Sequence, residues 1–270
     1  MEGDCSMQVP NNIPVERTTI WSFPDRGNWA THKGDYRGNW SPYIPHNLIS
    51  RYSNEREWIL DQFSGSGTTL IEAKLLNRNA IGIDINPNAV RLTKNRTTFE
   101  YSSSSRLEIR QGDAQKLDFI KSNSIHLICT HPPYADMITY SDNIQEDLSH
   151  LDVDGFLSKM NAVALEAFRV LKPGRYCAFM MGDLRRHGVL YPLGFKSMEI
   201  FTNCGFTLKE IIIKEQHNCR SSDYWEGKEN RFLLLAHEYI FVLQKPFPEK
   251  SYPLREPETL IYEESVELPF

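Results

Sequence analysis

A glycine turn and three aspartates are the residues of this 270-residue chain whose types and spacing best suit binding chemistry. The turn, residues 63–67 with the sequence Phe-Ser-Gly-Ser-Gly, follows an apolar run, and glycines there let the backbone approach a ligand closely. Asp61 stands just before the turn, where its carboxylate could face an ammonium group. Asp84 and Asp113 follow the next two apolar runs, where one can accept both hydroxyls of a ribose and the other an adenine amino group.

These residues indicate a particular kind of cofactor. A glycine pair or a single aspartate is more often a tight turn or a helix cap, but three aspartates at successive strand ends are harder to explain in that way. No lysine stands in a Gly-Lys-Ser/Thr phosphate loop, which disfavours a nucleoside triphosphate. A cofactor with an adenosine part, an amino-acid end and no phosphate fits better.

The elements that must position these residues alternate between strand and helix. Apolar runs predict the strands, and apolar residues at helical spacing predict the helices between them. Pro87 suits a first helical turn, and the Lys-Pro-Gly sequence at 172–174 ends another helix. This alternation predicts an α/β fold with a mostly parallel sheet covered on both faces. We expect strands at 58–63, 80–85, 107–110, 125–130, 176–181, 207–213 and 238–243, and helices at 68–77, 87–96, 156–171 and 193–203.

The composition is that of a globular protein. With 40% hydrophobic and 24% charged residues, it excludes collagen-like, coiled-coil and wholly disordered chains. Five cysteines without a Cys-x-x-Cys pair favour neither disulfides nor a zinc knuckle, and we expect no metal site. The formal charge of −5 is concentrated in residues 249–270, which hold six Glu against one Lys and one Arg, so charge neither favours nor excludes a polyanion. We find no apolar stretch long enough for a membrane helix and no signal peptide pattern.

The sequence resembles the S-adenosylmethionine-dependent methyltransferases, specifically the amino-methylating DNA methyltransferases that modify cytosine N4 or adenine N6. The resemblance covers roughly residues 31–245: residues 61–69 are similar to the family's cofactor loop, 82–87 to its ribose-binding strand end, 112–114 to its adenine-contacting turn and 237–240 to its closing strand. It implies a Rossmann-like, doubly wound fold with a mostly parallel seven-stranded sheet and an antiparallel last strand. The cofactor-binding residues that it implies are Asp61, Phe63, Ser64, Gly65, Gly67, Thr68, Thr69, Asp84, Ile85, Asp113 and Ala114.

The sequence Thr-His-Pro-Pro-Tyr at 130–134 follows the fourth expected strand, where this family carries Ser-Pro-Pro-Tyr or Asp/Asn-Pro-Pro-Tyr. An ordinary polyproline turn is the alternative interpretation. Acceptors that hold the hydrogens of an exocyclic amino group favour the pyramidal nitrogen that attacks a sulfonium methyl. A proline turn supplies carbonyl acceptors at fixed positions, and a tyrosine ring offers a face to a base flipped out of the duplex. The resemblance therefore implies His131, Pro132, Pro133 and Tyr134 as catalytic residues.

His131 departs from the family pattern, which has Ser in cytosine-N4 enzymes and Asp or Asn in adenine-N6 enzymes. A neutral imidazole can still accept a hydrogen bond from an amino group and take the released proton. Thr130 and residues 140–142 look closer to the cytosine-N4 subgroup, which we favour. Adenine N6, an RNA base and an inactive cofactor-binding subunit remain as alternatives.

Three further segments are candidates for binding. Residues 32–50 resemble the segment that covers the methionine end of the cofactor in this family, so Lys33 or the amides near Gly34 would meet its carboxylate. The loops 183–191 and 216–231 combine basic and aromatic residues, which suits phosphate contact and base stacking, although such loops are often only solvated. The nucleic-acid-binding candidates in them are Arg185, Arg186, Arg220, Lys228 and Arg231.

We expect one catalytic domain at 21–248, between a flexible N-terminus at 1–20 and an acidic tail at 249–270. The expected function is site-specific DNA methylation from S-adenosylmethionine, in a restriction–modification or related system. We expect a cytoplasmic, nucleoid-associated protein whose target is recognised by short loops, by a homodimer or by a separate specificity subunit. Carbon-5 cytosine methylation is disfavoured because no Pro-Cys pair occurs, and a Gly-x-Ser-x-Gly hydrolase elbow is also missing from the sequence.

Overall fold

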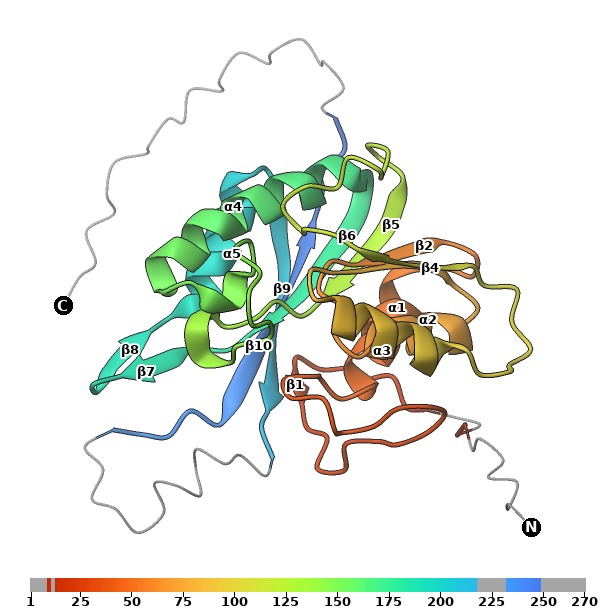
Figure 1. The fold of residues 1–270 in the computed structure, drawn as a ribbon, viewed down its shortest axis with the longest axis horizontal. Helices are drawn as coiled ribbons and strands as arrows, with labels where there is room; N and C mark the ends of the chain where they lie inside the picture. The colour runs from red at the N-terminus through yellow and green to blue at the C-terminus, as the bar shows by residue number, and fades with distance from the viewer. Residues whose placement is uncertain (1–8, 11–12, 218–231, 249–270) are drawn as a thin grey trace, which may run out of the picture.

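The structure, a computed structural model, describes residues 9–10, 13–217 and 232–248. Its centre is a twisted sheet with helices on both sides (Figure 1). In chain order the elements are β1 (Ile20–Trp21), α1 (Tyr43–Tyr52), β2 (Trp58–Asp61), α2 (Thr68–Leu75), β3 (Asn79–Asp84), α3 (Pro87–Thr97), β4 (Leu107–Gln111), β5 (Ile125–Thr130), η1 (Ala135–Met137), η2 (Leu148–His150), α4 (Val153–Val170), β6 (Leu171–Met181), β7 (Leu184–Arg186), β8 (Val189–Tyr191), α5 (Leu193–Asn203), β9 (Thr207–Glu215) and β10 (His237–Gln244).

The sheet has eight strands in the order β1-β9-β10-β6-β5-β2-β3-β4. β10 is antiparallel to both neighbours, and every other pair in this sheet is parallel. The C-terminal ends of β2, β3, β5, β6 and β9 therefore meet the N-terminal end of β10 at one edge. In sheets of this kind ligands bind beyond that edge.

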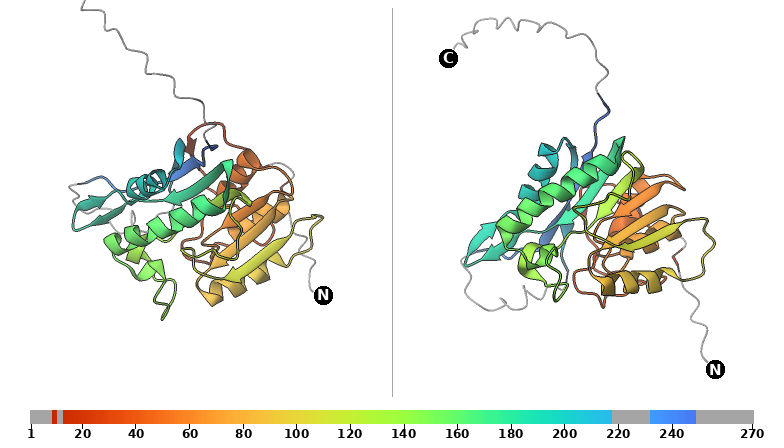
Figure 2. Two further views of the ribbon diagram at one scale, coloured as in Figure 1. Left: turned by 90° about the horizontal axis from the view of Figure 1, so that it is seen from above. Right: turned by 45° about the horizontal axis from the view of Figure 1, so that its top comes forward.

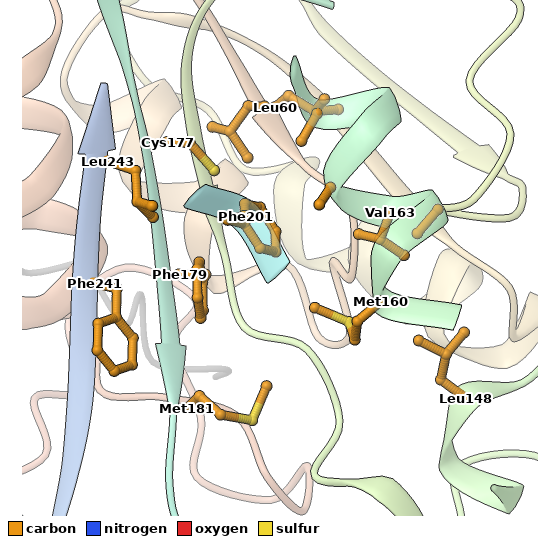
Figure 3. Close-up of a cluster of buried hydrophobic side chains, with 14 of the residues drawn as sticks. Leu60, Leu148, Met160, Val163, Cys177, Phe179, Met181, Phe201, Phe241 and Leu243 are labelled. Carbon is orange, nitrogen blue, oxygen red and sulfur yellow. The ribbon is translucent and has the colours of Figure 1, made fainter. Parts of the chain in front are cut away.

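Alternate residues of the strands feed two cores, one on each face of the sheet, as their period of two requires. Phe179 and Phe241 contribute to the core under α4 and α5 (Figure 3), whereas Ala178 and Ile240 contribute to the core under α1 and α2. The views in Figure 2 show the sheet lying between these two helical layers. Burial on both faces explains why the central strands β2, β3 and β5 and the second half of β6 are mostly apolar in the sequence, whereas the outer strands β4 and β9 carry charges.

The expected α/β fold with an antiparallel last strand is confirmed. The bounds of β5 and α5 agree with the sequence prediction, and the other predicted elements differ at their ends by a few residues. The largest shift is at β6, which begins at Leu171 because the chain passes from α4 into the strand without an intervening loop. The short β1 is an eighth strand where seven were expected, and it pairs with β9.

A β-hairpin stands where we expected a loop at 183–191. Its strands β7 and β8 pair through Arg186 and Val189, and the turn between them consists of His187 and Gly188, both with positive φ (50° and 78°). Two residues with positive φ form the turn that matches the twist of a two-residue hairpin. A histidine at the first turn position gives a weaker signal than Asn-Gly, so the sequence did not predict it. The hairpin projects from the body of the protein (Figure 1).

The predicted domain limits can be compared with the structure at the N-terminal side. The limit at residue 20 falls on β1, and the backbone N–H of Glu16 already donates to Asn47 at 2.5 Å. The acidic tail at 249–270 lies outside the described residues. No helix in the described part of the chain is both long and apolar enough to span a membrane.

Candidate active site

The glycine turn links β2 to α2 in a conformation that other residues would strain. Gly65 and Gly67 have φ values of 50° and 87°, in the left-handed region that favours glycine. A Cβ on Gly67 would lie 2.9 Å from Cγ2 of Thr93, and a Cβ on Gly65 would lie 3.2 Å from the ring of Tyr36. Close packing therefore fixes both glycines, and Gly67 is the residue that caps α2.

Asp84 ends β3 and holds the turn from the neighbouring strand. One carboxylate oxygen accepts from the backbone N–H of Gly65 at 2.8 Å, and the other accepts from the N–H of Asn86 at 2.9 Å. Burial raises the pKa of Asp84 to about 6, although these hydrogen bonds oppose the shift. Each oxygen keeps a free lone-pair position, so at neutral pH the carboxylate can accept from further donors.

Asp61 ends β2 and ties three segments together. Its carboxylate accepts from the hydroxyls of Thr69 at 2.6 Å and Thr130 at 2.7 Å, and from the N–H of Phe63 at 3.1 Å. Burial raises the pKa of this carboxyl to about 6, against the lowering effect of the three hydrogen bonds. Most of its accepting capacity is thus used within the protein, so its first role is to join the glycine turn to the end of β5.

The ends of these strands surround a cavity of about 730 Å³, part of which is open to solvent. Lys33, Gly67 and Thr69 do not line it, and Lys33 is exposed. The cofactor-binding candidates that line it are Asp61, Phe63, Ser64, Gly65, Thr68, Asp84, Ile85, Asp113 and Ala114.

Two buried polar atoms on the cavity wall bear on what it can bind. Oε1 of Gln62 and Oγ of Ser64 have no hydrogen-bond partner among the described residues, although buried polar groups normally have one. The carboxylate of Asp113 accepts from the backbone N–H of Gln115 at 2.8 Å and keeps further lone pairs. These acceptors, together with Asp84, fit a ligand rich in hydroxyl and amino donors, such as adenosine with an amino-acid end.

The segment before β2 covers this cavity with residues that the sequence analysis did not select. Tyr36 stacks on Tyr140 with ring centroids 6.1 Å apart, and Asn39 donates to the hydroxyl of Ser66 at 3.0 Å. Tyr36, Asn39 and Trp40 of this segment line the cavity, as do Ser66, Tyr140, Glu146, Asp147 and Leu148. The sequence resemblance predicted a covering segment here, but it pointed to a lysine rather than to the aromatic residues.

A fully buried carboxylate anchors the covering segment to α2. Glu72 accepts from Trp29 Nε1 at 2.7 Å, from His32 Nε2 at 2.7 Å and from His46 Nδ1 at 2.8 Å. Burial alone would raise the pKa of Glu72, but the hydrogen bonds from the two histidines lower it overall. A buried acceptor with three donors fixes the path of the chain on both sides of the covering residues.

His131 is the first residue after β5 and lies where two cavities meet. Its Nε2 is 2.9 Å from the hydroxyl of Tyr134, and its ring stacks on Trp40 with centroids 5.5 Å apart and planes inclined by 21°. Burial lowers its pKa to about 4, although the carboxylate of Glu238 opposes the shift. The imidazole is therefore neutral at physiological pH.

The second cavity, of about 1370 Å³ including open space, lies beside the first and shares with it Gly38, Asn39, Trp40, His131 and Tyr140. Pro132 and Tyr134 face this cavity and Pro133 faces the first, so the catalytic candidates are divided between the two. Lys214 and Glu238 also line it, and no motif in the sequence indicates either residue. The arrangement places one neutral imidazole on the wall that the two cavities share.

The two described candidates for phosphate contact, Arg185 and Arg186, differ in the contacts that their guanidinium groups already make. Arg186 forms an ion pair with Asp136, directly after the Pro-Pro-Tyr turn. Arg185 lies over the ring of Phe232 at 4.6 Å, and its hydrogen bonds to described residues are long, each 3.4 Å, to the carbonyls of Gly188 and Leu233. The other three candidates, Arg220, Lys228 and Arg231, lie outside the described residues.

Known proteins resemble this chain in sequence over about half its length. The Type II methyltransferase M.MjaI of Methanocaldococcus jannaschii is 31% identical over 173 residues, which cover 53% of this chain and 56% of that protein. The tRNA (guanine(10)-N2)-dimethyltransferase of Pyrococcus abyssi is 29% identical over 156 residues, which cover 57% and 43%. The matches thus span about half the length of these curated relatives.

Structural and family comparisons agree on the fold. A solved structure, a SAM-dependent methyltransferase from Methanosarcina mazei, superposes with a TM-score of 0.52 and 18% identity, and covers 74% of this chain and 98% of that one. The profile of the family described as DNA methylase matches residues 6–95, and that described as methyltransferase domain matches residues 53–228. Since the second match extends over more than half of the sequence, this chain belongs to the methyltransferase domain family.

Proposed function

We propose that this protein uses S-adenosylmethionine to methylate an exocyclic amino group of a base in DNA, and that cytosine N4 is the favoured position. The observation that carries the proposal is the position of His131, which lines both the cavity suited to adenosine and the second cavity. The match of residues 6–95 to the DNA methylase family and the similarity to M.MjaI support a DNA substrate. The methyltransferase domain match supports the cofactor.

On the cofactor side, the residues of the chain bind and orient. Asp84 would accept the ribose hydroxyls, and Asp113 would accept from the adenine amino group. Gln62 and Ser64 offer the buried acceptors that lack partners among the described residues. When bound, S-adenosylmethionine supplies an electrophilic methyl group on sulfur. The covering residues around Trp40 would exclude water from the reacting atoms.

On the base side, His131 supplies a hydrogen-bond acceptor and Tyr134 lines the space for the base. A neutral imidazole accepts a hydrogen from the exocyclic amino group, which favours the pyramidal nitrogen that attacks. After transfer, the same nitrogen can take the proton that the methylated amine loses. Pro132 and Tyr134 line the second cavity, where a flipped base would lie beside His131.

Three other substrates or roles compete with cytosine N4. Adenine N6 presents the same chemical group, and the similarity to a tRNA (guanine(10)-N2)-dimethyltransferase favours an RNA base as a second candidate. An inactive cofactor-binding subunit would bind S-adenosylmethionine and transfer nothing. We also propose, from the relatives named Type II methyltransferases, that the protein serves a restriction–modification system and acts in the cytoplasm on nucleoid DNA, alone, as a homodimer or with a specificity subunit.

The experiment is to incubate the full chain with methyl-labelled S-adenosylmethionine and, in parallel, mixed-sequence duplex DNA, single-stranded DNA and tRNA. Mass spectrometry of the nucleosides then identifies the methylated position. We expect N4-methylcytosine from DNA, and none from a His131→Ala variant that still binds the cofactor by calorimetry. N6-methyladenine or a methylated tRNA base would replace the cytosine assignment, and cofactor binding without transfer to any nucleic acid would contradict the enzymatic function.

A further inference from the structure

A line of polar side chains runs from His131 across the carboxyl edge of the sheet. Nε2 of His131 lies 2.9 Å from the hydroxyl of Tyr134, which donates to Oε1 of Glu238 at 2.6 Å. Nζ of Lys214 donates to Oε2 of the same carboxylate at 3.2 Å. Lys214 and Glu238 both lie on the wall of the second cavity.

The sheet itself fixes the far end of this line. Lys214 on β9 and Glu238 on β10 are direct cross-strand partners, so their side chains emerge on the same face of an antiparallel pair. Both side chains are largely buried, with 16% and 10% of their surfaces exposed. Burial by itself would raise the pKa of Glu238, but the charge of Lys214, aided by His131 and by hydrogen bonds, lowers it overall. Glu238 is therefore an ionised carboxylate at neutral pH.

The direction of each hydrogen bond follows from the chemistry of its groups. An ionised carboxylate only accepts and an ammonium only donates, so Glu238 receives hydrogens from both Tyr134 and Lys214. A tyrosine hydroxyl has a single hydrogen, and here it points at Glu238. Its oxygen can then only accept from His131, which must carry its hydrogen on Nε2.

A neutral imidazole with a hydrogen on Nε2 has a lone pair on Nδ1. Nδ1 of His131 has no hydrogen-bond partner among the described residues. It is also absent from the set of fully buried polar atoms that lack a partner there, which includes Oε1 of Gln62 and Oγ of Ser64. The stacked ring of Trp40 limits rotation of the imidazole. His131 lines both cavities, and its second ring nitrogen is therefore an acceptor rather than a donor.

We propose that Glu238, held by Lys214 and acting through Tyr134, is a positioning residue that keeps His131 in the tautomer with a hydrogen on Nε2, so that Nδ1 accepts from the amino group of the target base. The part that concerns the base rests on the proposed function, whereas the choice of tautomer rests on the hydrogen bonds alone. A hydrogen on Nδ1 would instead point a donor at an amino group that needs an acceptor. The imidazole can replace the side-chain oxygen found at this position in related motifs only when its hydrogen is placed in this way.

The variant Glu238→Gln reverses the constraint with little change in shape. A glutamine amide has one accepting oxygen, and Lys214 needs it because an ammonium cannot accept. The amide NH2 then faces Tyr134, whose hydroxyl must turn to donate to Nε2 of His131. The hydrogen of the imidazole consequently moves to Nδ1.

The test is histidine-selective 15N NMR of the full chain without ligand, with the His131 signals assigned by comparison with His131→Gln. In the wild type we expect a lone-pair signal from Nδ1 and an N–H signal from Nε2, and in Glu238→Gln the reverse. Tyr134→Phe removes the hydroxyl that transmits the constraint, so the signals of His131 should average between the two tautomers. Adding Glu238→Gln to Tyr134→Phe should then change them no further. Glu238→Asp keeps an accepting carboxylate and should keep the wild-type pattern.

Activity gives the second readout. Glu238→Gln should lower kcat for methyl transfer by roughly 100-fold or more, the range of one general acid–base contribution, with little change in the KM for S-adenosylmethionine. The proposal is overturned if a folded Glu238→Gln protein keeps the wild-type nitrogen pattern. It is equally overturned if wild type and Tyr134→Phe give the same His131 signals, a comparison that does not depend on the glutamine variant folding. If no nucleic acid is methylated while the tautomers behave as expected, only the proposed function fails.

Discussion

Replacing Asp84 with asparagine tests the cofactor site with the least change in shape. In the structure the two carboxylate oxygens already accept from the N–H groups of Gly65 and Asn86, and Asp84 lines the cavity with lone pairs to spare. An amide keeps one accepting oxygen, so a ribose loses at least one hydrogen bond to a charged acceptor. That loss is worth roughly 1–3 kcal/mol, which corresponds to about a 5- to 150-fold weaker Kd.

The assay is isothermal titration calorimetry with S-adenosylmethionine, together with urea unfolding of the ligand-free protein at pH 7. Because burial raises the pKa of Asp84 to about 6, ionising it lowers the stability of the ligand-free protein as the pH rises from about 4 to 6. Asparagine avoids this cost but leaves one of the backbone N–H groups of Gly65 and Asn86 without its acceptor. These two effects oppose each other, so the free energy of unfolding should change less than the binding free energy. Glu108→Gln on β4, a half-buried carboxylate outside the cavity that pairs with Arg110, is the matched control and should change neither by much. An unchanged Kd in Asp84→Asn would remove this carboxylate from the site.

Three other outcomes follow from the same geometry. Tyr134→Ala should lower the transfer rate far more than cofactor affinity, because its ring faces the second cavity; equal losses in single-turnover rate and Kd would assign it to the cofactor pocket. The pKa of His131 is lowered to about 4, so kcat at saturating cofactor should stay constant down to about pH 5. The pKa of Asp84 is raised to about 6, so the KM for cofactor should rise below about pH 6. A kcat that falls already at about pH 6.5 would contradict a neutral imidazole. Arg185→Ala should flatten the log–log salt dependence of DNA binding by about one unit, as measured by fluorescence anisotropy. Arg186→Ala should change this slope less, because Arg186 already pairs with Asp136. Equal slopes in Arg185→Ala and wild type would make Arg185 an ordinary solvated residue.

The elements that sequence predicts best carry their own local signals. Helix α5 lies between Pro192 and Gly205, which mark its two ends, and β5 is a mostly apolar strand that is buried at every position except His126. The glycine turn was predictable because positive φ and close packing permit little else at Gly65 and Gly67. These features depend on residues that are neighbours in the sequence.

The part of the site that sequence did not predict depends on contacts between distant segments. Trp40 is 91 positions before the histidine on which it stacks, and nothing in its own neighbourhood distinguishes it from a core tryptophan. The pairing of Lys214 with Glu238 depends on the register of β9 against β10. Both strands begin more than 70 residues after Tyr134. Register follows from packing across the sheet, and spacing along the chain does not reveal it.

The surroundings of His131 bear on whether the departure from the family pattern marks a lost activity. Three separate elements converge on this ring: Trp40 stacks on it from the covering segment, Tyr134 bonds it from its own turn, and Glu238 supports that bond from β10. A buried ion pair such as that between Glu238 and Lys214 is costly to desolvate and seldom adds stability over apolar side chains of similar volume. Such a pair at the rim of a cavity is better explained by a requirement to orient a functional group than by folding. These contacts therefore support the proposal of an altered but working acceptor over the alternative of an inactive site.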